Sequence, residues 1–191
     1  GANGQITSEQ IDSVLSNFER GDLLLLQNEI NLLDEIIRKA SERGMKIALN
    51  PSPIADNITS LPLDKITYFL LNEIEGKELT DKEDPDDIIQ VLRKRYPHSI
   101  VVLTLGSKGS IYDDGDILCT HSIYKVDAVD TTAAGDTFTG YFLNAITSGV
   151  GPIRSLQTAS KASALAVSRM GAAPSIPTMQ EVNEANLELK K

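Results

Sequence analysis

The sequence predicts an α/β domain with three layers, in which a mostly parallel sheet lies between helices. Short apolar runs such as 23–27, 46–50 and 100–105 alternate with stretches whose apolar residues recur at helical spacing. Polar residues follow the carboxyl ends of these runs, which is where ligands bind in open α/β sheets. The 191 residues are enough for a substantial core, and we expect a single domain over residues 1–191.

The first part of the chain has the pattern of a β-α-β unit. The expected elements are a helix that begins at Thr7 or Ser8 and reaches 18, a buried strand over 23–27, a helix over 32–40 that stops at Gly44, and a strand over 46–50. Because a helix connects the two strands, we expect them to be parallel, with a right-handed crossover.

The pattern then repeats and gives way to helices. The expected elements are a strand over 66–71, helices near 74–79 and 86–95, a strand over 100–105, a hairpin formed by 110–112 and 117–119, a strand-like run over 124–129, and helices over about 136–148, 153–169 and 178–189. The helix over 153–169 is rich in Ala and Ser, so we expect it to pack closely against a neighbour.

The composition narrows the possible partners and setting. The formal net charge of −9 argues against a general nucleic-acid or anionic-membrane surface, so we expect neither partner. Cys119 is the one cysteine, which permits no intrachain disulfide and suggests no Cys-based zinc site. No apolar run approaches the length of a membrane span. These features indicate a cytoplasmic protein.

Residues 130–138 (DTTAAGDTF) combine a small-residue turn, two carboxylates and the start of a helix. Such a turn directs unpaired backbone N–H groups and the positive end of a helix dipole toward an anion. A carboxylate beside an anion site, here Asp136, suits a base that accepts a proton from a hydroxyl attacking a phosphoryl group. The alternative of roughly equal weight is that Asp136 merely caps the helix.

Four other segments allow both a structural and a functional interpretation. Residues 106–109 (GSKG) are a turn or a ligand loop, and the chain contains neither a Walker A loop nor G-x-G-x-x-G. Asn72 and Glu75 start a helix or hold water around Mg²⁺. Glu29 is a solvated helix start or a partner for sugar hydroxyls. Residues 169–175 are a glycine-capped helix end, or their carbonyls and Ser175 join Asp130 around a monovalent cation.

Several segments together resemble the ribokinase-like family of carbohydrate and nucleoside kinases. The segments that carry the resemblance are 27–29 (QNE), 50–53 (NPSP), 72–75 (NEIE), 104–109 (TLGSKG), 130–138 (DTTAAGDTF) and 171–175 (GAAPS). Their order and spacing match the family over essentially the whole chain, and they are most similar to its ribose-phosphorylating members. The resemblance implies ATP-dependent transfer of a phosphoryl group to the 5-hydroxyl of D-ribose, with Mg²⁺ and K⁺ as cofactors. Another sugar, or a nucleoside, remains the alternative acceptor.

The resemblance also implies a role for each matching residue. Asp136 would be the catalytic base, and the backbone anion hole would comprise Ala133, Ala134 and Gly135. The sugar would contact Glu29 and Asp136. ATP would contact Asn72, Thr104, Leu105, Gly106, Ser107, Lys108, Gly109, Gly135, Asp136 and Ser160. Mg²⁺ would be held through water by Asn72 and Glu75. K⁺ would be surrounded by Asp130, Thr132, Ala166, Arg169, Gly171 and Ser175.

The start of the chain departs from the family pattern. In the family, a segment like residues 1–3 follows central strands, a small β lid and a Gly-Gly sugar motif, and none of these occurs here. We therefore expect this chain alone to have little or no kinase activity. We also expect an exposed sheet edge that favours self-association, such as a homodimer. A non-catalytic nucleotide-binding or interaction fragment is the alternative of a different class.

Overall fold

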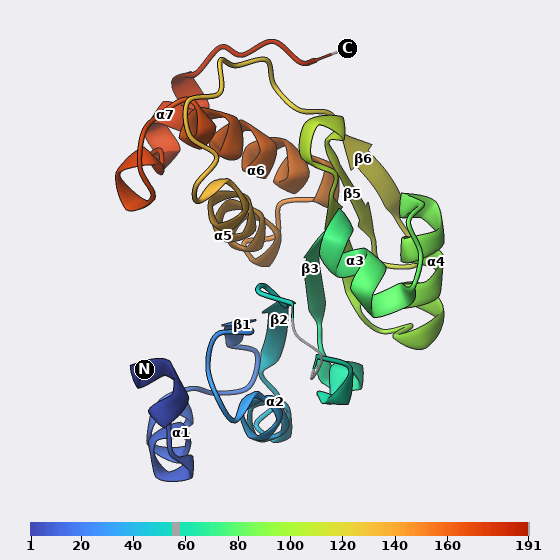
Figure 1. Ribbon diagram of the computed structural model, residues 1–191, viewed down its shortest axis with the longest axis vertical. Helices are drawn as coiled ribbons and strands as arrows, with labels where there is room; N and C mark the ends of the chain where they lie inside the picture. The colour runs from blue at the N-terminus through green and yellow to red at the C-terminus, as the bar shows by residue number, and fades with distance from the viewer. Residues whose placement is uncertain (55–57, 191) are drawn as a thin grey trace. The chain divides into compact units, whose positions relative to one another are not determined.

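The computed structural model describes residues 1–54 and 58–190. Its described residues form two compact units, which are treated separately below (Figure 1). The first unit comprises residues 1–104 together with 113–117, without 55–57. The second comprises residues 105–112 and 118–190.

Four parallel strands form the sheet of the first unit. In spatial and sequence order they are β1 (Leu23–Gln27), β2 (Lys46–Asn50), β3 (Tyr68–Asn72) and β4 (Ile100–Thr104). The register pairs Gln27 with Asn50 and Asn72 with Thr104, so polar residues end each strand at the same edge. This confirms the predicted β-α-β arrangement and the placement of polar residues at the carboxyl ends of the strands.

The helices of the first unit begin where the sequence supplies caps. They are α1 (Ser8–Leu15), α2 (Leu33–Glu42), α3 (Glu73–Thr80) and α4 (Pro85–Arg95), with short 3-10 turns at Ala2–Gln5, Ile58–Ser60 and Leu63–Lys65. Thr7 and Gln10 form a reciprocal capping box at α1. Asp84 caps α4, whose first residue is Pro85, and basic residues fill its last turn. The predicted helices are thus confirmed, within a few residues at their ends.

The core of the first unit consists of side chains from the strands and from the helices packed on them. The fully buried members include Ile37, Ile47, Leu49, Phe69, Ile88, Leu92, Val101 and Leu103. In β1 the expectation of a buried strand was wrong, since only Leu26 is buried and Leu25 is 44% exposed. The reason is that β1 ends the strand order and has one strand neighbour among the described residues.

The second unit contains a hairpin and three helices. Its elements are the 3-10 turn Gly106–Lys108, the strands β5 (Ser110–Asp113) and β6 (Leu118–His121), the helices α5 (Ala134–Thr147), α6 (Pro152–Val167) and α7 (Met179–Glu184), and the 3-10 turn Ala173–Ser175. Helices α5 and α6 lie side by side (Figure 1). Ala159, Ala162 and Ala166 on α6 are fully buried, as expected for a helix whose small residues permit close packing. None of the helices described in either unit is long and apolar enough to cross a membrane.

Two predictions for this unit were wrong, namely the strand over 124–129 and the length of the last helix. The run 124–129 is not a strand, and Tyr124 forms only an isolated antiparallel bridge with Leu189. The last predicted helix stops at Glu184 instead of reaching 189. Both errors have one cause, because the tail leaves α7 and hydrogen-bonds to the chain before α5. The Lys125 N–H donates to the Glu188 carbonyl at 2.8 Å, and the Lys190 N–H donates to the Ile123 carbonyl at 2.8 Å.

We predict that Leu103→Ala lowers the free energy of unfolding by about 2–5 kcal/mol, because Leu103 is fully buried in β4 and its truncation leaves a cavity. Leu25→Ala is the matched control, since it removes the same atoms from a half-exposed strand position and should cost about 1 kcal/mol or less. Urea unfolding followed by circular dichroism measures both. Equal losses would contradict the burial assigned to the two strands.

Candidate functional site

Helix α5 begins without a side-chain cap. Its N-cap residue is Ala133, which adopts a left-handed conformation with φ 62° and has no side chain that could accept a capping hydrogen bond. The Ala134 N–H donates to the Thr131 carbonyl at 3.2 Å. Asp136 is therefore not the N-cap residue of α5 but a residue of its first turn, and its role as a base stays a prediction. The helix dipole and the N–H groups that follow Ala134 in the first turn are the features that attract an anion.

Asp136 lies in the first turn of α5, at a pocket of the second unit. The pocket has a volume of about 360 Å³ and is lined by Asp136, Thr137, Gly140, Tyr141 and Asn144 from α5, with Ile176 and Met179 opposite. Asp136 is exposed, and an added Cβ at the neighbouring Gly135 would meet no atom within 4 Å. A carboxylate is thus placed beside open space at the positive end of a helix, as a base for an incoming hydroxyl requires.

Helix α6 fixes the first turn of α5. The Ser163 hydroxyl donates to the Ala134 carbonyl at 3.0 Å. Further along α5, the rings of Phe138 and Phe142 stack with centroids 6.3 Å apart. Ser160, the residue expected near the adenine, is buried on α6. Ser163 was not among the predicted site residues, although the many Ser and Ala residues of this helix indicated close contact with a neighbour.

The loop expected to line the nucleotide forms a tight turn. The Leu105 N–H donates to the Gly109 carbonyl at 2.8 Å, and the Lys108 N–H donates to the Leu105 carbonyl at 2.9 Å. Gly106, Ser107 and Lys108 are exposed, whereas Leu105 and Gly109 are buried. The backbone of this segment is therefore compact, with its central residues facing solvent, which suits either a plain turn or a ligand loop.

Gly109 lies directly against the backbone of β6. It has φ 104° and ψ −141°, a conformation available to glycine, and an added Cβ would clash with the carbonyl oxygen of His121. The Nδ1 atom of His121 is buried and has no hydrogen-bond partner among the residues that the structure describes. Burial lowers the pKa of His121. We interpret His121 as structural.

Asn72 and Glu75 form a reciprocal capping box at the start of α3. The Asn72 N–H and side-chain amide each donate to one oxygen of Glu75 at 2.9 Å, and the Glu75 N–H donates to the Asn72 side chain at 3.0 Å. Glu75 is 4% exposed, and burial raises its pKa, against the opposing effect of the Asn72 hydrogen bonds. The structural interpretation of this motif is therefore confirmed, and the water-mediated Mg²⁺ role stays a prediction.

The exits of β1, β2 and β4 carry the remaining predicted residues of the first unit. Glu29 lies exposed in the turn after β1. Its neighbour Asn28 ties that turn to the exit of β2, because its N–H donates to the Ser52 carbonyl at 2.9 Å and its side-chain amide to the Pro53 carbonyl at 2.8 Å. Thr104 ends β4 and donates through its hydroxyl to the Leu71 carbonyl at 3.2 Å.

Asp130 joins two segments of the proposed cation site. One of its oxygens accepts from the Thr132 N–H and the other from the Gly171 N–H, both at 2.9 Å. A hydrogen bond from the Thr132 side chain, followed by these two from the backbone, lowers the pKa of Asp130, so its carboxylate is ionised at neutral pH. Ser175 is fully buried, and its hydroxyl donates to the Ala172 carbonyl at 2.7 Å.

The donor groups at this position fit a hard monovalent cation. The predicted set offers a carboxylate, a hydroxyl and backbone carbonyls, all of them oxygen ligands. The structure brings Asp130, Thr132 and Gly171 together, and the Arg169 N–H turns back to the Ala166 carbonyl at 3.0 Å. Within the described residues, no cluster of three or more His, Cys, Asp or Glu side chains suited to a metal ion occurs.

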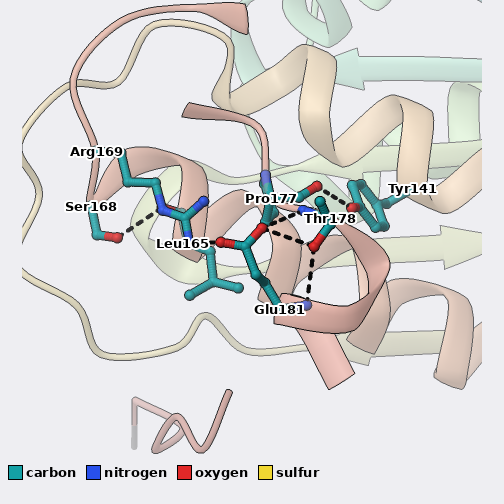
Figure 2. Close-up of polar contacts among 7 residues, drawn as sticks. All are labelled: Tyr141, Leu165, Ser168, Arg169, Pro177, Thr178 and Glu181. Atoms are coloured by element: carbon teal, nitrogen blue, oxygen red, sulfur yellow. Dashed lines mark hydrogen bonds and ion pairs between the residues drawn. The ribbon is translucent and has the colours of Figure 1, made fainter. Parts of the chain in front are cut away.

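The side chain of Arg169 points to α7. Its guanidinium contacts Glu181 at 2.7 Å, and Glu181 also accepts from the N–H and hydroxyl of Thr178 (Figure 2). The hydrogen bond from the Thr178 backbone, followed by those from Arg169 and the Thr178 side chain, lowers the pKa of Glu181 to about 2. Glu181 was not among the predicted site residues, although Thr178 and Glu181 have the T-x-x-E spacing of a capping box.

We predict that Gly109→Ala destabilises the second unit by more than about 1–3 kcal/mol, because the strained backbone and the clash with His121 act together. The control is Gly106→Ala, where φ is 50° and an added Cβ would meet no atom within 4 Å, so only about 1 kcal/mol should be lost. Denaturant unfolding compares the two variants. Finding Gly106→Ala as damaging as Gly109→Ala would refute the close contact.

The sequence matches the family described as pfkB family carbohydrate kinase over residues 1–179. Among curated relatives, the ribokinase of Schizosaccharomyces pombe is 35% identical over 202 aligned residues, which cover 100% of this chain and 63% of the relative. The ribokinase of Lactococcus lactis is 32% identical and is covered over 62% of its length. The chain thus spans less than two thirds of the length of these relatives.

Solved structures agree with the sequence comparison. The ribokinase of Cryptococcus neoformans in complex with ADP is 27% identical, with a TM-score of 0.82 over 96% of this chain and 64% of that chain. This supports the predicted fold, an α/β architecture with a mostly parallel sheet. Because the family match covers nearly the whole sequence, the chain belongs to the pfkB family of carbohydrate kinases.

Proposed function

We propose that the chain carries the catalytic base of a kinase that transfers the γ-phosphoryl group of ATP to the 5-hydroxyl of D-ribose, and that the chain alone has little or no activity. The observation that carries this proposal is the start of α5, which has no side-chain cap among the described residues and places Asp136 beside a pocket. A phosphoryl group in transfer is an anion attacked by a hydroxyl, and this arrangement provides for both. The Arabidopsis thaliana ribokinase solved with ribose and ATP is 29% identical and supports the choice of substrates.

In this proposal, Asp136 takes the proton from the attacking hydroxyl. The backbone of Ala133, Ala134 and Gly135 forms the wall that faces the transferring group, and the dipole of α5 stabilises the negative charge that spreads over its oxygens. Since the Ala134 N–H donates to Thr131, the next N–H groups of the first turn, those of Gly135 and Asp136, would be the donors to the transferring group. Catalysis then rests on positioning and electrostatics.

The other predicted residues bind the nucleotide, the sugar and the cations. ATP would lie against Thr104 and the loop 105–109, with Ser160 near the adenine and Asn72 near the phosphates. Glu29 would accept hydrogen bonds from sugar hydroxyls. Mg²⁺ would neutralise phosphate charge and be held through water by Asn72 and Glu75. K⁺ would be held by the oxygen donors around Asp130 and would fix the segment that leads into α5.

The setting and assembly are also part of the proposal. The protein would act in the cytoplasm, on small molecules. The exposed edge of β1, where Leu25 is 44% exposed, is the surface through which copies would associate. A kinase of another sugar or of a nucleoside would use the same base and anion site, and the Salmonella typhimurium deoxyribokinase is 27% identical to this chain. Assays with ribose, deoxyribose and a nucleoside distinguish these acceptors.

We predict that Asp136→Asn lowers kcat for ribose phosphorylation by about 10²–10⁴-fold, because the amide cannot accept the proton. Binding of ATP should not weaken, since the substitution removes a negative charge beside the proposed phosphate site and leaves the loop 105–109 untouched. Turnover is measured by coupled ADP release and ATP binding by calorimetry. Both are measured in the chain itself and in the chain joined to the part of a ribokinase that it does not match.

The matched control is Asp127→Asn, at an exposed position of the same unit. It should leave both turnover and ATP binding unchanged. Turnover that survives Asp136→Asn would show that the assigned base is wrong. ATP binding with no turnover in either form would favour a non-catalytic nucleotide-binding protein.

A further inference from the structure

One carboxylate joins the two ends of the loop between α6 and α7. The loop begins after Val167 and ends at the N-cap of α7, Thr178. At its beginning, Arg169 donates to Oε1 of Glu181 at 2.7 Å. At its end, the N–H and hydroxyl of Thr178 donate to Oε2 of Glu181 at 2.6 and 2.9 Å. Figure 2 shows both contacts converging on Glu181.

The same loop is tied to α5. The hydroxyl of Tyr141 donates to the carbonyl of Pro177, next to the end held by Glu181 (Figure 2). Ile176 and Met179 on either side of this contact form the wall of the Asp136 pocket that faces α5. The position of this wall therefore depends on how the end of the loop is held.

Between its two tied ends, the loop carries Gly171 and Ser175. Gly171 has φ 90° and donates its N–H to Asp130, while Ser175 is fully buried. Glu181 does not contact either residue in the hydrogen bonds and ion pairs of the described chain. Its effect on them must act through the loop ends, because a loop with closed ends has fewer conformations than an open one.

We propose that Glu181 is a positioning residue for the monovalent cation site. By joining Arg169 to Thr178, it holds Gly171 and Ser175 in place beside Asp130. The inference rests on the cation set named under the proposed function, but not on the identity of the phosphoryl acceptor. Glu181→Gln replaces one acceptor oxygen with an amide that donates, so it cannot satisfy both Arg169 and Thr178. The loop ends then separate more easily, and the cation loses part of its preformed site.

The experiment measures K⁺ binding without sugar or nucleotide. The melting temperature of the chain is followed as KCl replaces choline chloride at constant ionic strength, because a ligand that binds the folded state raises it. We expect KCl to stabilise the parent chain. In Glu181→Gln, the KCl concentration that gives half of the stabilisation should rise by about 5–20-fold, equivalent to about 1–2 kcal/mol of binding free energy.

Further variants make the result specific. Glu184→Gln is the matched control, since it changes a carboxylate of the same helix that bonds only Gln180 among its described partners, and it should leave the KCl midpoint unchanged. Arg169→Gln should raise the midpoint as Glu181→Gln does. Combining both substitutions should raise it no further, because each breaks the same link. If Glu181→Gln does not fold, Arg169→Gln and Thr178→Val decide the question.

A merely structural role predicts a different outcome. Glu181→Gln would then lower the melting temperature equally at every KCl concentration and leave the midpoint where it is in the parent, which would overturn the proposal. A parent chain that KCl does not stabilise beyond choline chloride would overturn it as well. Neither result bears on Asp136, whose role is decided by turnover and ATP binding, so failure here and failure of the proposed function are distinguishable.

Discussion

The start of α5 is the constraint on which the candidate site depends. Ala133 occupies a left-handed conformation that costs an ordinary residue about 1 kcal/mol or more, and as the N-cap residue it provides no side-chain hydrogen bond to the helix. Such an arrangement persists only because its surroundings hold it. Ser163 holds the Ala134 carbonyl, and Phe138 and Phe142 anchor the helix beyond. The cost is offset by packing, and the helix end remains open to a ligand.

The chain that enters α5 is hydrogen-bonded to the loop that leaves α6. Asp130 accepts from Gly171, which lies 41 residues away in the sequence, and thereby links the chain entering α5 to the loop leaving α6. Glu181 then fixes the far end of the same loop. In both cases an ionised carboxylate uses its two oxygens to hold two different partners. Charge-assisted hydrogen bonds are stronger than neutral ones, which suits them to this bridging task.

The first unit presents a different type of scaffold. Its parallel strands end in polar residues at one edge, where Asn28 ties the turn after β1 to the exit of β2 and Asn72 and Glu75 bond each other at the start of α3. The capping box of Asn72 and Glu75 shows how one motif can have both a structural and a functional interpretation. The two side chains satisfy each other first, and each retains a lone pair that could accept a hydrogen bond from water.

The sequence by itself determined the elements whose signals are local. The capping signal at the start of the first helix and the apolar runs of β1 to β4 identified their elements, because each depends on residues a few positions apart. The AAGD turn also made Asp136 the candidate base, with a helix cap as an equal possibility, and its role stays a prediction.

The tertiary structure decided everything that depends on a distant partner. Tyr124 pairs with Leu189 and so does not continue a sheet, and Leu25 is exposed although its run reads as buried. Arg169 finds Glu181 twelve residues further on, after a loop whose course no periodicity describes. Burial and long-range pairing follow from which segments meet in space, and a local pattern contains no information about the segment it will meet.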